Sequence, residues 1–320
     1  MTKPQARLEG VYPILATPFT ETGEVDEASL RELVRFLLHA KVDGIALFGN
    51  ASEMYTLLDR ERERIAGIVC EEVKGRVPLV FGSGHTGLEG AVHLSKWAEK
   101  AGADMLMVLP PYMVKPDNQR LYEYFAAVAK AVDIPVMLQD APGASGVSIP
   151  VASMVKLARD FPNITHVKVE APPTTVKITE VVERSEGRLT VFGGLNGIYL
   201  YEELCRGAVG TMPACEFPDV CVEIFQLFRS GNREAARELF YRYLPFIRIG
   251  TIQGYAMSVH KEVLKAGGVI RSAYVRNPNP PVDEQLRKEV FETLKGLNPL
   301  VLQWKDRHSG IQPASGSGGN

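Results

Sequence analysis

The chain has 320 residues and a formal net charge of -2, and 45% of its residues are hydrophobic while 23% are charged. This composition is typical of a globular protein with a large core, and it lacks the basic excess of proteins that bind nucleic acid or an anionic membrane. No apolar stretch is long enough to cross a bilayer, and residues 1–5 lack the apolar region of a secretory signal, so we expect a cytoplasmic protein.

Apolar, β-branched runs alternate with amphipathic patterns through the first two thirds of the chain. The runs predict strands at residues 11–16, 44–48, 78–82, 104–109, 134–138, 164–169, 189–193 and 208–212. One-sided apolar stripes between them predict helices at 27–41, 59–74, 88–101, 119–132, 150–160, 174–186 and 197–206. Eight strands separated by helices in about 200 residues is the count of a (β/α)8 TIM barrel, an α/β fold.

The alternative α/β fold is a doubly wound sheet. Its glycine fingerprint is absent, because the glycines of residues 82–87 have the wrong spacing. After residue 218 only helical patterns follow, at 219–230, 232–247, 254–266 and 283–296. We therefore expect a barrel core over 8–218, the last barrel helix with a C-terminal helical extension over 219–306, and a flexible tail over 307–320.

One predicted strand, at 164–169, carries a lysine, Lys168, inside an apolar run. Burying an ammonium group is costly unless it is paired, or unless its pKa falls and it becomes a nucleophile. A desolvated lysine that attacks a carbonyl group is the basis of Schiff-base catalysis. The alternative is a lysine at a strand end whose ammonium group reaches solvent.

Polar residues gather where the predicted strands end, which is where TIM barrels place their chemistry. The segments that follow strands two to eight are 49–53, 82–86, 110–112, 139–142, 168–170, 193–197 and 211–214. Together they read G-x-x-x-E, then P-P-Y, then A-P, then V-K-x-E. This order resembles the dihydrodipicolinate synthase / N-acetylneuraminate lyase family, and the resemblance covers residues 8–305. It implies a TIM barrel in which Lys168 forms a Schiff base with a 2-oxo acid and the loop at 49–53 binds the carboxylate of that acid.

Several positions depart from the usual pattern of that family. Gln139 stands where a tyrosine normally relays protons, and Asn50 and Ala51 replace the usual pair of hydroxyl residues. Met113 replaces a second tyrosine, and Ala144 stands where an arginine binds the second substrate of dihydrodipicolinate synthase. Because an amide does not titrate in the useful range, Gln139 cannot do the acid–base work of a phenol. These differences argue against dihydrodipicolinate synthesis.

One branch of the family, the 2-keto-3-deoxy-L-arabinonate dehydratases, combines Q-D-A-P, K-x-E and an N-x-S-E loop, as this chain does. The resemblance implies a hydro-lyase that converts the 2-keto-3-deoxy sugar acid to 2-oxoglutarate semialdehyde. The chemistry implied needs no metal or other cofactor, and the four cysteines show neither metal-ligand nor disulfide spacing.

Each site residue has an expected role. Lys168 would attack the C2 ketone, and Glu170, two residues along the strand and on the same face, would be the general base and acid. Gln139 would orient a hydroxyl group or water. Asn50, with the backbone amides of Ala51 and Ser52, would hold the carboxylate. Further substrate contacts are expected from His85, Tyr112, Gly194, Asn196 and Thr211.

Some residues have alternative structural roles. His85 is also explained as a histidine that caps its loop, and Tyr112 as an aromatic residue at an interface between protomers. Glu53 is expected to be structural, accepting hydrogen bonds from backbone N–H groups at the start of the next helix.

Two other functions stay open. The first is a pyruvate-dependent aldolase of the same family, with the same lysine but carbon–carbon cleavage. The second is a barrel that binds a 2-oxo acid without catalysis. The resemblance also implies a homotetramer or homodimer.

Overall fold

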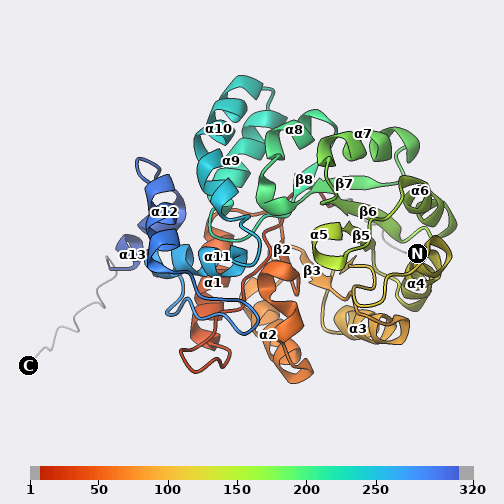
Figure 1. Cartoon of the computed structure of the whole chain (residues 1–320), viewed down its shortest axis with the longest axis horizontal. Helices are drawn as coiled ribbons and strands as arrows, with labels where there is room; N and C mark the ends of the chain where they lie inside the picture. The colour runs from red at the N-terminus through yellow and green to blue at the C-terminus, as the bar shows by residue number, and fades with distance from the viewer. Residues whose placement is uncertain (1–7, 310–320) are drawn as a thin grey trace, which may run out of the picture.

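The computed structural model describes residues 8–309, with side chains described as far as residue 305. The described part contains eight parallel strands, curled into a barrel and surrounded by helices (Figure 1). The strands are β1 (Gly10–Val11), β2 (Ile45–Leu47), β3 (Leu79–Gly82), β4 (Met105–Val108), β5 (Val136–Asp140), β6 (Ile164–Val169), β7 (Thr190–Gly193) and β8 (Gly210–Thr211). The predicted barrel of parallel strands is confirmed.

Hydrogen bonds beyond the named strands close the barrel. The sheet runs in the order β1-β8-β7-β6-β5-β4-β3-β2. After β1, the Leu15 N–H donates to the carbonyl of Ala46 in β2 over 2.8 Å, and the Ala46 N–H donates back to Pro13 over 3.0 Å. The predicted first strand, 11–16, is therefore reduced to two residues of regular ladder, because Pro13 has no N–H to give to it.

The helices between the strands begin and end close to the predicted positions. They are α1 (Glu27–His39), α2 (Asp59–Val73), α3 (Leu88–Lys100), α4 (Asn118–Ala131), α6 (Val151–Asp160), α7 (Thr174–Arg184) and α8 (Leu200–Cys205). Local caps explain some of the starts: Asp26 accepts a hydrogen bond from the Ser29 N–H at α1, and Asp117 accepts one from the Arg120 N–H at α4. A one-turn helix, α5 (Pro142–Ser145), follows β5 and was not predicted.

A layer of apolar side chains fills the inside of the barrel below its carboxyl end. Its buried members are Tyr12, Ile14, Ala46, Val80, Met105, Met107, Met137, Phe192 and Met212. Side chains two residues apart on a strand share a face. Gln139 follows Met137 in this way on β5, so it lies above the layer, at the end of the barrel where the strands run into their following loops.

Helices continue after β8. They are α9 (Pro218–Arg229), α10 (Arg233–Ile249), α11 (Ala256–Ala266), α12 (Glu284–Thr293) and α13 (Leu300–Ser309). In Figure 1, α11 to α13 appear in blue on the side of the barrel that carries α1. Trp304 of α13 is buried there: its ring lies edge-on to Phe36, 5.1 Å between centroids, and its indole N–H donates to Glu32 of α1 over 2.8 Å.

Both ends of the chain carried expectations. The first residues of the tail expected over 307–320 belong to a helix, because α13 extends to Ser309. The rest of that expected tail, 310–320, lies outside the described residues, as do residues 1–5, on which the expected lack of a secretory signal rests. Among the described helices, none has the length and apolarity needed to cross a membrane.

Candidate active site

A cavity of about 490 Å³ opens at the carboxyl end of the barrel. Six of the predicted site residues line it, namely Asn50, Ala51, Gln139, Lys168, Glu170 and Asn196. They come from the loop after β2, from β5, from β6 and its end, and from the loop after β7. The chain thus brings segments that are more than 100 residues apart in sequence to one pocket.

Lys168 lies near the end of β6, paired in register with Gln139 of β5 and Phe192 of β7. Only 3% of the residue is exposed, so the alternative of a lysine that reaches bulk solvent is wrong. Its Nζ lies 3.3 Å from Oε1 of Glu170, the described carboxylate that pairs with it. A buried amine beside a carboxylate in the wall of a pocket is an arrangement that Schiff-base chemistry can use.

Three groups hold the Glu170 carboxylate in place. Gln139 Nε2 donates to Oε2 over 2.9 Å, and the Leu195 N–H donates to Oε1 over 3.1 Å. Lys168 Nζ faces the same Oε1. Gly194 does not line the pocket, but a Cβ at that position would overlap Glu170 Cγ, so glycine there makes room for the carboxylate.

A second carboxyl group, Glu203 of α8, lies buried behind β7 and was not predicted. Its pKa is raised to about 8, mainly by burial and in smaller part by the charge of nearby Glu170, while a hydrogen bond from Thr174 opposes the shift. That bond runs from Thr174 Oγ1 to Oε1 over 2.7 Å. A Cβ at Gly193 would overlap Oε2, so glycine at the end of β7 leaves the space that this carboxyl group fills. Near neutral pH Glu203 is mainly protonated.

The loop after β2 differs from its predicted role at Ser52. The Ser52 N–H donates to the Gly49 carbonyl over 3.0 Å, and its hydroxyl donates to the Leu15 carbonyl over 2.6 Å. The residue is buried and does not line the pocket, so the expected use of its amide by a carboxylate is wrong. Asn50 and Ala51 keep their places in the cavity wall.

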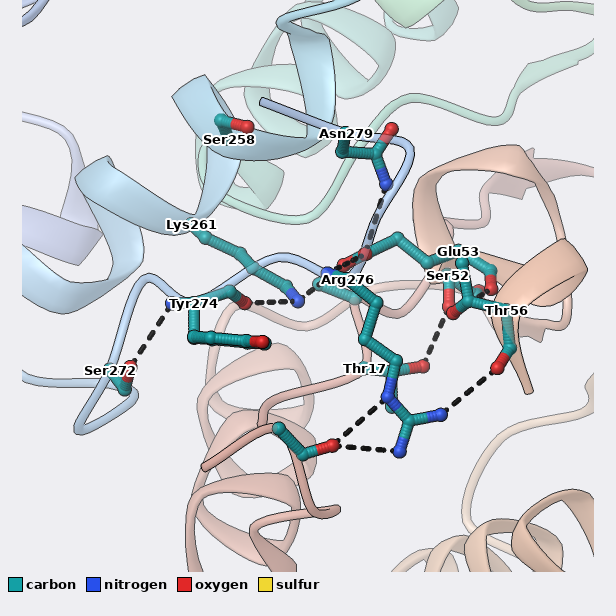
Figure 2. Close-up of polar contacts among 12 residues, drawn as sticks. Thr17, Ser52, Glu53, Thr56, Ser258, Lys261, Ser272, Tyr274, Arg276 and Asn279 are labelled. Atoms are coloured by element: carbon teal, nitrogen blue, oxygen red, sulfur yellow. Dashed lines mark hydrogen bonds and ion pairs between the residues drawn. The ribbon is translucent and has the colours of Figure 1, made fainter. Parts of the chain in front are cut away.

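Glu53, at the end of the same loop, is fully buried and structural (Figure 2). Oε1 pairs with Lys261 Nζ of α11, and Oε2 accepts from the Arg276 N–H and from Asn279 Nδ2, each over 3.0 Å. The expected acceptance from the next helix is therefore wrong: the partners lie 208 to 226 residues further along the chain. Burial lowers the pKa of Lys261 to about 8, against the attraction of Glu53.

The same network fixes one wall of the cavity. Asn279 accepts a hydrogen bond from the Tyr55 hydroxyl over 2.8 Å, and both residues line the pocket. The Arg276 guanidinium, seen at the centre of Figure 2, donates to the Gly23 and Thr56 carbonyls and pairs with Glu61. These bonds attach the segment around 272–279 to the loop after β2, and they hold that loop in position.

Three other predicted contacts lie outside the cavity lining. His85 Nδ1 accepts from the Gly87 N–H over 3.1 Å just before α3, which is the loop-capping alternative. Tyr112 is half-buried and packs against the main core. Thr211 of β8 is fully buried, and its hydroxyl has no hydrogen-bond partner within the described residues.

The cavity also contains a histidine that the strand-end reasoning missed. His260 of α11 lines the pocket, and its Nδ1 lies 2.7 Å from Oε1 of Glu216. Both residues are buried. The sequence signal for His260 was weak. It consists of two adjacent polar residues, His260 and Lys261, in a helix whose inner face is otherwise mainly apolar. Across residues 8–305, no three His, Cys, Asp or Glu side chains form a group that could hold a metal ion.

Comparison with known proteins places this barrel. Residues 7–297 match the model of the dihydrodipicolinate synthetase family. The chain is 32% identical to an L-2-keto-3-deoxyarabonate dehydratase from Azospirillum brasilense over 93% of this chain and 97% of the relative. It is 33% identical to a 4-hydroxy-tetrahydrodipicolinate synthase from Methanopyrus kandleri over 90% of this chain and 95% of that protein.

Solved structures agree with this placement. A prophage protein of the dihydrodipicolinic acid synthase family from E. coli K12, solved in complex with pyruvate, superposes with a TM-score of 0.85 at 28% identity, covering 91% of this chain and 99% of that one. The barrel, the order of the motifs and these matches lead to one conclusion: the chain belongs to the dihydrodipicolinate synthetase family, a family of lyases.

Proposed function

We propose that this lyase dehydrates a 2-keto-3-deoxy sugar acid through a Schiff base, with 2-keto-3-deoxy-L-arabinonate as the expected substrate and 2-oxoglutarate semialdehyde as the product. The observation that carries the proposal is the trio in which Nζ of the buried Lys168 faces Glu170 and Gln139 fixes the far oxygen of that carboxylate. The similarity to an L-2-keto-3-deoxyarabonate dehydratase supports the same substrate class.

The chemistry follows from this trio. Lys168 adds to the C2 ketone and water leaves, which gives an iminium that acidifies the C3 protons. Glu170 removes a C3 proton, and the resulting enamine expels the C4 hydroxyl group as Glu170 passes that proton to it, so that water leaves. Gln139 keeps Glu170 in position and has no proton of its own to exchange in the useful pH range. Hydrolysis of the final iminium frees Lys168.

Binding of the substrate is assigned to the pocket wall. Asn50 and the backbone of Ala51 would bind the carboxylate next to the ketone, and Asn196 would contact a hydroxyl group. His85, Tyr112, Gly194 and Thr211 would act from outside the lining, by shaping the walls. We also propose the predicted division at residue 218 into barrel and helical extension, a homotetramer or homodimer, and a cytoplasmic location.

Dihydrodipicolinate synthesis fits the pocket less well, although synthases are as similar overall as the dehydratase. The pocket position expected to bind the second carboxylate of that reaction is Ala144, whose methyl group offers neither charge nor a hydrogen bond. Gln139 occupies the position of the proton-relay tyrosine, and its side-chain amide donates a hydrogen bond to Glu170. A substrate with one carboxylate does not need the missing arginine.

Borohydride trapping tests the proposal. Wild type and Lys168→Met are each incubated with 2-keto-3-deoxy-L-arabinonate or with pyruvate, reduced, and mapped by peptide mass, and the unreduced products are identified in parallel. We expect an adduct on Lys168 in the wild type alone and semialdehyde from the sugar acid. Pyruvate as a product would assign an aldolase, and no adduct with either compound would leave a barrel that binds without covalent catalysis.

A further inference from the structure

We propose that His260, oriented by Glu216, is a second proton-transfer residue of this pocket and removes a proton from C5 of the substrate. The inference rests on the proposed function and extends it, because it assigns the step that converts the dehydrated adduct to the semialdehyde. Lys168 and Glu170 come from β6 and its end, whereas Glu216 follows β8 and His260 lies on α11, so the two acid–base pairs come from different elements, and His260 lines the same cavity as Lys168 and Glu170.

The His260 ring is held in one orientation. Its Nδ1 lies 2.7 Å from Glu216 Oε1, and the two residues are only 4% and 1% exposed. A carboxylate in this position accepts from Nδ1–H, which leaves the lone pair on Nε2. Within the described residues Nε2 has no hydrogen-bond partner, while the residue lines the cavity. The second ring nitrogen is thus the one available to a ligand.

The surroundings of Gly250 show that the His260 ring lies close to Asn196, one of the predicted substrate contacts. A Cβ at Gly250 would lie 3.1 Å from His260 Cε1 and 2.7 Å from Asn196 Nδ2, so the imidazole and this amide flank one point. Asn196 is itself fixed, since its Oδ1 accepts from the Ala214 N–H over 2.9 Å and its Nδ2 donates to the Ile247 carbonyl. Its neighbour Leu195 holds Glu170. The two acid–base pairs are therefore linked through one short segment.

The reaction requires proton transfer at two carbons. Loss of the C3 proton and the C4 hydroxyl group leaves an iminium conjugated with a C3=C4 double bond. To reach the semialdehyde, a C5–H bond must break, its electrons forming C4=C5 while the conjugated electrons move toward nitrogen. C5 lies three carbon–carbon bonds beyond the carbon bonded to Lys168, so a base on another wall is suited to this step.

The step balances with the residues present. Nε2 of His260 takes the C5 proton, and Glu216 stabilises the imidazolium that forms. Glu170, which has passed the C3 proton to the leaving hydroxyl group, takes a proton from solvent water and delivers it to C3, which restores the C2 iminium, and His260 releases the C5 proton to solvent. Hydrolysis then releases a 2-oxo acid with an enol at C4 and C5, and the enol becomes the aldehyde by gaining a proton at C4 and losing its hydroxyl proton.

Substitution His260→Gln tests the assignment, with His93→Gln on the exposed face of α3 as the matched control. The substrate is 2-keto-3-deoxy-L-arabinonate with hydrogen or with two deuterium atoms at C5. We expect turnover to fall by about 100-fold, the size of one general acid–base contribution. Deuterium at C5 would slow this variant more than the wild type, and 5-hydroxy-2-oxopent-3-enoate would be released in place of semialdehyde. Borohydride trapping of pyruvate on Lys168 would persist, and Glu216→Gln would show the same pattern in weaker form.

The other results overturn the assignment in distinguishable ways. Wild-type turnover by His260→Gln would remove the histidine from the reaction while leaving the proposed function intact. Loss of pyruvate trapping together with turnover would mean that His260 only supports the fold of the pocket. If the wild type itself made no semialdehyde, the proposed function would fail and the assignment would fail with it.

Discussion

Substitution Glu203→Gln is expected to change how the stability of the protein depends on pH. The glutamine keeps the volume of the protonated acid, and its carbonyl oxygen accepts the same hydrogen bond from Thr174. It removes only the ability to ionise. The wild-type carboxyl group has a pKa raised by burial to about 8, whereas an unfolded chain gives it the ordinary value of 4.5.

The sign follows from proton binding. Between pH 4.5 and about 8 the folded protein holds a proton on Glu203 that the unfolded chain has lost, so this residue makes the fold less stable as pH rises. Each pH unit in that window costs about 1.4 kcal/mol. The window spans 8 - 4.5, or about 3.5 pH units, which sets a limit of about 5 kcal/mol at pH 8. The limit is as large as the whole stability of many domains.

Equilibrium urea unfolding of both proteins, at half-unit steps from pH 5 to pH 8, measures this effect. All other titrating groups are common to the two proteins, so the difference between them isolates residue 203. We expect the variant to be more stable than the wild type by a margin that grows with pH. Parallel curves would refute the reasoning, because they would mean that Glu203 ionises in the fold as it does in the unfolded chain.

Two further substitutions test particular contacts. Gly194→Ala places a methyl group where Glu170 Cγ lies, so we expect turnover to fall strongly while borohydride still traps pyruvate; unchanged turnover would mean that Glu170 tolerates displacement. Lys261→Met leaves the buried Glu53 carboxylate without its cation and should reduce stability in urea by about 3–5 kcal/mol. The control is the exposed Lys265→Met on the same helix, and equal losses in the two variants would contradict the pairing argument.

The sequence predicted the barrel and the centre of the site because both depend on local patterns. Alternating apolar runs and stripes mark strands and helices, and the barrel rule then places every strand end at one rim. Lys168 and Glu170 could be placed on one face because residues two apart on a strand point the same way. The pairing of these two side chains and the burial of Lys168 agree with that reasoning.

Contacts made by distant segments could not be predicted in the same way. Glu53 has partners more than 200 residues away, which no local pattern identifies. Ser52 is a polar loop residue that could have faced either the pocket or the protein, and only the packing of the loop on Leu15 decides it. His260 was not predicted because the barrel rule points only to residues at strand ends, whereas His260 reaches the pocket from α11. For Glu53 and His260 the chain after β8 supplies the contacts that the barrel pattern lacks.

One departure of this chain from the synthase pattern, glutamine at position 139, is explained by how Glu170 is held. Gln139 donates to Oε2, while Leu195 and Lys168 lie at Oε1, so the two carboxylate oxygens have separate surroundings. In the proposed reaction, the oxygen that faces the lysine would be the one that exchanges a proton with a lysine-bound substrate. A phenol at position 139 would titrate and compete for that proton, whereas an amide orients the carboxylate without taking part. Gln139 and Glu170 therefore form one hydrogen-bonded unit. Replacing Gln139 alone by tyrosine would remove the hydrogen bond that positions Glu170, and position 144 would still lack the positive charge of an arginine.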